Sequence, residues 1–513
     1  MTPRQRWTLI ATVIGSGAVF LDGTIVNVAL PSIGRELPAT LVGVLEGQTY
    51  VISGYLAVLA ALLILAGALS DRYGRRRVYA IGLAGFAITS GLCGLAPTLE
   101  VLVIARLLQG AAGALMVPGA LSIITQTFTE AERGRAFGIW TSATSALALV
   151  GPLVGGILVD SIGWRFAFLV NVPILAIAFA ITMRHVAESR DLDPSRRFDW
   201  LGSIVAAIAV GGLSFGVIRG GEHAWQDPVA WIAIVVGAIA LVAFPLLMAR
   251  RRDPLVPLGL FRSRAFSTIN LATFFVYGGL YVMLSYLSIV LQGAIGYSAV
   301  AAGIAVLPIG ICLITLSTRI GTISSRTGAR GFLTFGPALM AAGLLWMVRL
   351  PSTSSPWPAS LEDPASLIPP SSYLVDVLPA VVLFGLGIAS VVAPLTSTLM
   401  GSIPQRFSGL GSAINNAIAR VGQPLLGAII FVAVSSTFYA ALATAAPGTD
   451  TTSAAVRSAF PPLNPPRPGA TPDQTTAAAQ ASVEAFHQAM LVAAALVGIG
   501  GGISWIGLRP EAE

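Results

Sequence analysis

Residues 67–82 read GALSDRYGRRRVYAIG, and they align without a gap on residues 321–336, GTISSRTGARGFLTFG. Both copies follow one long apolar segment and precede another. Glycine, serine and arginine recur at the same places, so that Gly67, Ser70, Arg72, Gly74, Arg76 and Gly82 match Gly321, Ser324, Arg326, Gly328, Arg330 and Gly336. The repeat predicts that one helical unit has been duplicated within the chain.

Composition places this duplicated unit in a membrane. Hydrophobic residues make up 55% of the 513 residues and charged residues 10%, and the mean hydropathy is +0.81. A soluble chain carries about a quarter charged residues. The formal charge of +7 does not indicate a nucleic-acid partner, because the arginines lie in short gaps between apolar segments. The two cysteines, Cys93 and Cys312, are too few for a disulfide framework or a metal site.

Apolar segments of about 18–28 residues follow one another along the chain, each long enough to cross a bilayer as a helix. We interpret the first as an uncleaved span, because it is too long for the apolar part of a signal peptide. The sequence therefore predicts an all-α polytopic membrane protein with fourteen spans: 7–33, 46–69, 78–96, 99–128, 134–159, 164–184, 200–218, 229–249, 265–291, 299–323, 332–350, 374–400, 408–440 and 487–508.

Arginine placement predicts the orientation. If the N-terminus is cytoplasmic, 21 of the 30 basic residues fall on the cytoplasmic side and six on the outer side. The positive-inside rule strongly favours this orientation. We expect a multi-pass protein of the cytoplasmic membrane with both termini in the cytoplasm.

The spans group into two bundles with an inserted pair. We predict an N-terminal six-helix bundle over 1–185, cytoplasmic loops and two extra helices over 186–264, and a C-terminal six-helix bundle over 265–513. Internal repeats of this kind are typical of secondary transporters, whose substrate sites lie near the membrane midplane between the repeats. The outer loops 351–373 and 441–486 are rich in Pro, Ser, Ala and Thr, which predicts disordered or extended chain, with a possible helix over 473–486.

Asp22 lies near the middle of the first span, in LDGTIVNVALP (21–31). A carboxylate at a helix centre costs about 2.5–3.5 kcal/mol to insert, so it is either paired or used. We expect this group to bind and release a proton, with Arg106 of the fourth span as a partner and with Thr24 and Asn27 orienting it. The alternative is a permanently paired structural Asp.

Four stretches together resemble signatures of the major facilitator superfamily, of the fourteen-span drug:proton antiporter type. They are LDGTIVNVALP (21–31), GALSDRYGRRR (67–77), RLLQGAAGALMVPGA (106–120) and LVGPLVGGILVD (149–160). The match extends over nearly the whole chain. It implies two six-helix bundles with two extra spans, proton-driven transport of a small molecule, no cofactor and a monomer.

The resemblance assigns roles to two motifs. It implies that the loop between the second and third spans is a conformational latch formed by Gly67, Asp71, Arg72, Gly74, Arg75 and Arg76. The alternative is that these arginines only fix topology. It also implies an antiporter hinge in the fifth span, formed by Gly151, Pro152, Gly155 and Gly156 and associated with export rather than uptake. Proline removes a backbone donor and kinks a helix.

Polar and aromatic side chains within the spans could line a cavity for small apolar compounds: Thr24, Asn27, Tyr50, Tyr55, Trp140, Tyr277 and Tyr281. Packing is the alternative for each of them. Glu46 and Asp376, near the outer ends of spans, are candidates for secondary proton or cation sites, although an interface role is favoured. We interpret Arg420, in NNAIARVGQPLLG (415–427), as structural.

These features predict proton-coupled efflux of small amphipathic or lipophilic compounds such as drugs or antibiotics. The sequence contains no GxxxxGK[ST] nucleotide-binding motif and no HExxH metal motif, so we expect neither an ATP-driven pump nor an enzyme. Three alternatives stay open: an exporter of an endogenous lipid or secondary metabolite, a membrane sensor that has lost transport, and an uptake transporter.

Overall fold

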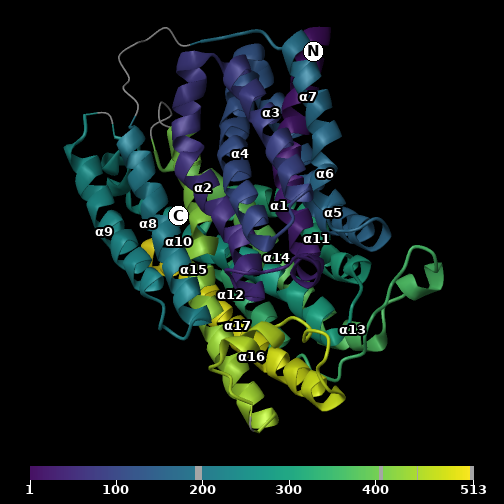
Figure 1. Ribbon diagram of the computed structural model, residues 1–513. Helices are drawn as coiled ribbons and strands as arrows, with labels where there is room; N and C mark the ends of the chain where they lie inside the picture. The colour runs from purple at the N-terminus through teal and green to yellow at the C-terminus, as the bar shows by residue number, and fades with distance from the viewer. Residues whose placement is uncertain (191–198, 253, 404–407, 448, 509–513) are drawn as a thin grey trace.

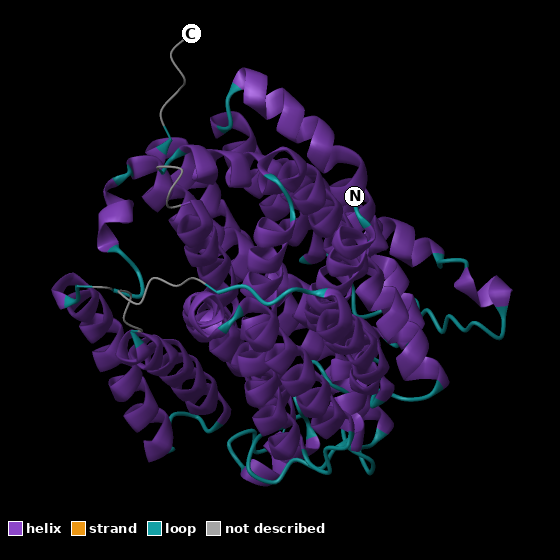
Figure 2. Ribbon diagram, turned by 90° about the horizontal axis from the view of Figure 1, so that it is seen from above, coloured by secondary structure: helices purple, strands orange, loops and turns teal. Residues whose placement is uncertain are grey.

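The computed structural model describes residues 1–190, 199–252, 254–403, 408–447 and 449–508. Within these ranges the chain consists of helices and connecting loops, without a strand (Figure 2). The predicted all-α class is therefore confirmed for the described part of the chain.

The N-terminal bundle is the purple-to-blue part of Figure 1. Its helices run up and down in turn and are joined by short loops. They are α1 (Pro3–Glu36), α2 (Val44–Tyr73), α3 (Arg75–Gly94), α4 (Leu99–Thr127), α5 (Glu130–Ser161), the short α6 (Phe166–Leu169) and α7 (Asn171–His185).

Two further helices, α8 (Trp200–Glu222) and α9 (Pro228–Arg250), pair with one another at one flank of the molecule (Figure 1). The second bundle follows. It contains η1 (Leu258–Arg262), α10 (Arg264–Val290), a π-helical turn η2 (Leu291–Ile295), α11 (Ala299–Thr327), α12 (Arg330–Met347), η3 (Pro364–Leu367), α13 (Ser371–Asp376), α14 (Leu378–Gly401), α15 (Ser408–Ala445), α16 (Ala454–Ala459) and α17 (Pro472–Gly507).

Twelve of the described helices are long and apolar enough to span a membrane. Two of the fourteen predicted spans are not among the twelve. Span 134–159 falls in α5, whose described apolar part is the shorter segment Ala146–Ser161, and span 332–350 falls in α12. Many apolar side chains of α9, such as Ile232 and Val242, are exposed, as expected for a helix that faces lipid.

We refer to the two ends of the helical bundle as the terminal end and the loop end. The terminal end holds the starts of α1, α10 and α12 and the end of α17; Arg330 Nη2 there lies 2.8 Å from the carbonyl oxygen of Trp505. The loop end holds the opposite ends of these helices. Segments 351–373 and 441–486 lie at the loop end.

The outer loops were predicted to be disordered or extended chain, and both contain extended chain together with short helices. The first loop contains η3 and buries Trp357, and the second contains α16 and buries Leu463 and Asn464. These side chains insert between the helix ends. A polar, proline-rich segment can therefore pack where a few of its side chains make buried contacts. The predicted helix over 473–486 forms the beginning of α17.

Several hydrogen bonds between the two bundles lie in the loop-end half of the molecule. The Ser285 hydroxyl donates to Asn27 Oδ1 at 2.8 Å, and the Gln292 amide donates to the Val28 carbonyl at 3.1 Å. Backbones also meet closely there, because a Cβ on Gly156 of α5 would lie 2.5 Å from the Ala299 carbonyl oxygen of α11. The bundles are therefore fastened together at the loop end.

Candidate functional site

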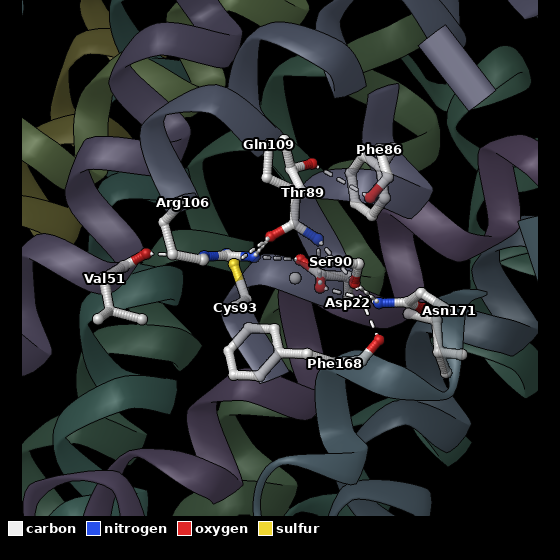
Figure 3. A network of polar contacts seen from close by, with 12 residues as sticks. Asp22, Val51, Phe86, Thr89, Ser90, Cys93, Arg106, Gln109, Phe168 and Asn171 are labelled. Carbon is white, nitrogen blue, oxygen red and sulfur yellow. Dashed lines mark hydrogen bonds and ion pairs between the residues drawn. The ribbon is translucent and has the colours of Figure 1, made fainter. Parts of the chain in front are cut away.

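Asp22 is fully buried in the middle of α1, and three side chains from other helices converge on it (Figure 3). The Arg106 guanidinium of α4 lies 2.6 Å from Asp22 Oδ2. The amides of Gln109 and Asn171 donate to Asp22 Oδ1 at 3.2 Å and 3.1 Å. The ion pair that the sequence led us to expect between Asp22 and Arg106 is present.

Arg106 is 1% exposed, and its Nε and Nη1 both donate hydrogen bonds. Nε donates to the Val51 carbonyl at 3.0 Å and Nη1 donates to Gln109 Oε1 at 2.7 Å. The guanidinium carbon lies 4.0 Å from the centre of the Tyr55 ring, a cation–π arrangement. A buried charge is tolerated when it is paired and hydrogen-bonded in this way.

A second layer of polar groups holds the amides in place. Ser90 Oγ accepts from both Gln109 Nε2 and Asn171 Nδ2 at 3.1 Å, and it donates to the Phe168 carbonyl at 2.9 Å. Each amide nitrogen thus donates one hydrogen bond to Asp22 and the other to Ser90. The network joins α1, α3, α4 and α7, so a change of charge at Asp22 reaches four helices of one bundle.

Sequence reasoning missed Ser90, Gln109 and Asn171. Each is a polar residue inside an apolar span, which is the signal that could have found them. Gln109 lies one helical turn after Arg106, and residues three apart share a helix face. Asn171 begins α7 just after the α6 turn, where its position relative to Asp22 depends on the packing of α7 against α1.

The predicted hinge residues lie where α5 contacts two partners. A Cβ on Gly155 would lie 3.0 Å from the Ile25 carbonyl of α1, and Gly156 faces Ala299 of α11. Gly151 packs on Thr24, and Pro152 lies against Gly303 of α11. The glycines let α5 approach both bundles at backbone distance. Their role as a hinge stays a prediction.

The predicted latch lies at the terminal end, where α2 ends and α3 begins. Gly74 has φ +108°, a conformation that favours glycine, and it allows the sharp turn between the helices. Glu188, from the segment after α7, accepts a hydrogen bond from the Arg76 backbone N–H at 3.1 Å and lies 3.7 Å from Arg77 Nε. The Arg75 backbone N–H donates to the Ser189 carbonyl at 3.0 Å.

These contacts tie the latch loop to the segment that leads toward α8. Gly67 lies in α2 against Pro118 of α4, and the Arg72 guanidinium lies 5.9 Å from the Tyr73 ring centre. The Asp71 side chain lies outside those that the structure describes. Latching between conformations stays a prediction.

The predicted cavity residues do not form one cluster. Tyr55 belongs to the Asp22 network, and Asn27 faces the second bundle through Ser285. Thr24 donates to the Leu21 carbonyl of its own helix at 3.0 Å. Tyr50 lies at the loop end beside Glu46, at 3.0 Å.

The remaining aromatics of that set lie on α5 and α10. Trp140 of α5 packs edge-on against Phe20 of α1, with 6.3 Å between ring centres. Tyr277 and Tyr281 lie on α10, where both are partly buried. Contact with a substrate stays a prediction for all of these residues.

Comparison with known proteins identifies the family. The model of the Major Facilitator Superfamily matches residues 12–427. Multidrug resistance protein Stp of Mycobacterium tuberculosis is 32% identical over 452 residues, covering 87% of this chain and 80% of that protein. The tetracenomycin C resistance and export protein of Streptomyces glaucescens is 33% identical over 433 residues, covering 84% and 76%.

Solved structures share the fold at low sequence identity. An inward-facing, unoccupied bacterial homologue of the human lysosomal transporter Spinster superimposes with a TM-score of 0.62 at 16% identity, covering 99% of this chain and 97% of that one. An autoinhibited peptide transporter of the POT family gives 0.65 at 14% identity, covering 100% and 98%. The chain therefore belongs to the Major Facilitator Superfamily and is a multi-pass membrane transporter rather than an enzyme.

Proposed function

We propose that this protein exports small amphipathic or lipophilic compounds, such as drugs or antibiotics, in exchange for protons across the cytoplasmic membrane. One observation carries the proposal: a fully buried carboxylate, Asp22, lies in the transporter core with Arg106 as its counter-ion. Ionisable groups at such depth are costly and are typical of proton pathways. The names of the relatives, which refer to drug resistance and export, support the direction of transport.

The proposed topology has fourteen spans. To the twelve apolar helices it adds α5 and α12, each of which runs antiparallel to the span before it and the span after it. The arginine bias then places the terminal end in the cytoplasm and the loop end outside. With the bundles fastened at the loop end, the structure corresponds to a state closed to the outside.

The mechanism uses competition for Asp22. In the ionised state the carboxylate accepts from Arg106, Gln109 and Asn171. Protonation of Asp22 neutralises the carboxylate and breaks its ion pair with Arg106. Arg106 then keeps its hydrogen bonds to the Val51 carbonyl and to Gln109. Because α1 carries both Asp22 and the contact with α5 through Thr24 and Gly151, loss of the ion pair would alter the packing that closes the loop end.

The energetics are adequate for efflux. One charge that crosses a potential of 100 mV yields about 2.3 kcal/mol. At about 1.36 kcal/mol per factor of ten, this sustains a roughly fifty-fold concentration gradient of exported compound per proton.

A second candidate is the export of an endogenous metabolite by the same fold. The relatives from Streptomyces favour it, because their names describe resistance to, and export of, antibiotic compounds. The same Asp22 chemistry would apply, and only the compound would differ. Induction of this gene by a compound that the cell itself makes would favour this candidate.

The test is transport by the purified full-length protein in proteoliposomes with an imposed pH gradient. The probe is a lipophilic cationic dye, and a protonophore collapses the gradient in the matched control. We expect dye accumulation that depends on the gradient and that is lost in Asp22→Asn but retained in Asp473→Asn, a change at an exposed carboxylate. Equal accumulation with and without the gradient would rule out proton coupling for this dye.

A further inference from the structure

A second pair of buried carboxyl groups lies at the loop end, where α8 meets the start of α2. Glu46 is fully buried in the first turn of α2. Glu222, the last residue of α8, is 7% exposed. Neither group belongs to the Asp22 network, and the proposed transport mechanism uses neither of them.

The two carboxyl groups have different surroundings. Glu46 accepts a hydrogen bond from the Gly43 backbone N–H at 2.9 Å and forms an ion pair with Arg219 Nη1 at 3.8 Å. The Tyr50 hydroxyl lies 3.0 Å from Glu46 and also 3.0 Å from the Phe215 carbonyl oxygen. The Gly43 N–H and Arg219 suit an ionised carboxylate, because each places positive partial or full charge against an oxygen. Glu46 therefore has more groups that stabilise a negative charge than Glu222 has.

Glu222 lacks such donors. Its Oε2 is buried and has no hydrogen-bond partner among the described residues. Its Oε1 packs directly over the Cα of Gly43, in the space that a side chain there would fill. Since the Gly43 N–H donates to Glu46, the two carboxyl groups lie on either side of one glycine.

The two neighbouring arginines, Arg219 and Arg457, interact with groups other than the Glu222 side chain. Arg219 Nε lies 2.5 Å from Asp227 Oδ2, in the loop between α8 and α9. Arg457 of α16 donates to backbone carbonyl oxygens, those of Glu222, Gly221 at 3.4 Å and Thr451 at 3.1 Å.

Other titratable groups complete the surroundings. Tyr439 of α15 lies beneath Arg457, with 4.2 Å between the guanidinium carbon and the ring centre. His223 follows Glu222, and its Nδ1 lies 3.2 Å from the Arg219 carbonyl. Within the described chain, no ion pair forms to Glu222.

We propose that Glu222 is a proton-binding site, separate from Asp22, that takes its proton from the water at the loop end. A buried carboxylate without donors is far less stable than the neutral acid. The charged Glu46 next to it adds like-charge repulsion, and two carboxyl groups with such different surroundings take different protonation states. The neutral acid removes both penalties at Glu222.

The site connects three parts of the protein. With a proton bound, the end of α8 packs on Gly43, the N-cap residue of α2, and Arg457 of α16 donates to the carbonyl oxygens of Gly221 and Glu222. Without the proton, repulsion between Glu222 and Glu46 separates α8 from α2. Proton binding at Glu222 thus fastens the extra helix pair and the segment that contains α16 to the first bundle.

Infrared difference spectroscopy of the full-length protein in lipid nanodiscs tests the proposal directly. A pH titration of the wild type is expected to show a protonated carboxyl C=O band at neutral pH that disappears at alkaline pH. This band is expected to be missing from Glu222→Gln and present in both Asp22→Asn and the exposed-residue control Glu36→Gln. A Glu222→Gln spectrum that matches the wild type would overturn the proposal.

Amide hydrogen exchange gives a second, independent measurement. Glutamine imitates the neutral acid, so Glu222→Gln is expected to fold with α8 attached to α2. Exchange over 219–223 is expected to be at least tenfold faster at alkaline than at neutral pH in the wild type and unchanged with pH, after correction for intrinsic exchange, in Glu222→Gln. The same acceleration in both proteins would contradict the proposal. Neither measurement requires transport, so failure of the proposed function would not affect them.

Discussion

The Asp160 carboxylate of α5 accepts a hydrogen bond from the Val300 backbone N–H, at 2.8 Å, in the first turn of α11. Asp160 also accepts from Ala299 N–H at 3.3 Å. A carboxylate is stabilised at a helix N-terminus, where the backbone N–H groups have no partner within the helix. This contact crosses from one bundle to the other, beside the close approach of Gly156, and helps to fasten the loop end.

Replacing Asp160 with Ala is expected to shift the protein toward a state open at the loop end. A hydrogen bond to a charged group contributes about 1.5–3 kcal/mol, which corresponds to at least a tenfold change in the ratio of closed to open molecules. Distances between spin labels at the loop-end tips of α1 and α11 measure this ratio. Asp450→Asn, whose carboxylate contacts only its own turn at Thr452, is the control. An unchanged distance distribution in Asp160→Ala would refute this role.

Gly156→Ala is expected to slow transport about tenfold or more while the protein stays folded. The added Cβ would lie 2.5 Å from the Ala299 carbonyl oxygen and 2.8 Å from its carbon, which are backbone atoms that cannot turn away. Overpacking of this kind costs about 1–3 kcal/mol. Gly138→Ala in the same helix is the matched control, because no atom lies within 4 Å of its added Cβ. Equal transport rates for the two variants would show that close contact of α5 with α11 is not needed.

Removing one partner of the central ion pair is expected to destabilise the protein more than removing both. Arg106→Gln leaves Asp22 buried without its counter-ion, and such a loss costs about 3–5 kcal/mol. The double variant Asp22→Asn with Arg106→Gln contains no stranded charge. Thermal unfolding in detergent is expected to rank the wild type first, the double variant second and Arg106→Gln last. A double variant less stable than Arg106→Gln would show that the pair is not coupled.

Asn464 fastens the loop-end segment that contains α16 to α2. Its amide exchanges two hydrogen bonds with the Gln48 amide, at 2.9 Å and 3.0 Å, and both side chains are buried. Asn464→Ala leaves the buried Gln48 amide without these two hydrogen bonds, which costs about 1–3 kcal/mol of stability. Amide exchange over 460–468 is expected to become about tenfold faster or more. Asn416→Ala, at an exposed side chain that bonds within its own helix, is expected to leave it unchanged; unaltered exchange in Asn464→Ala would exclude a fastening role.

Much of the fold follows from apolar segment length, because a helix that crosses a bilayer needs about twenty apolar residues whatever its neighbours are. The partnership of Asp22 with Arg106 could be predicted for a similar reason: few charges lie inside the spans, and each needs a partner. Gln109 and Asn171 could not be chosen in advance, since neutral amides occur in membrane helices for many reasons and only packing brings these two to Asp22.

The loop-end segment that contains α16 shows that composition alone does not predict which side chains are buried. Its prolines and small residues indicated disordered or extended chain without a buried core. The chain is extended over much of 460–471, yet Leu463 is fully buried, with φ +63°, and Asn464 pairs with Gln48, which lies more than 400 residues earlier. Glu222 poses the same difficulty, because its contact with Gly43 joins distant parts of the chain. Such long-range contacts leave no local periodicity in a sequence.

Coupling of transport to protons through Asp22 can be separated from binding of the dye by a comparison of two assays. Asp22→Asn proteoliposomes are assayed for dye exchange without a gradient and for dye accumulation under a pH gradient. If Asp22 carries the coupling proton, the rate of dye exchange by the variant stays within about twofold of the wild-type rate. Its gradient-driven dye accumulation is then at least tenfold lower than that of the wild type. Accumulation by Asp22→Asn equal to that of the wild type would contradict the claim, and the coupling proton would then be carried by another group.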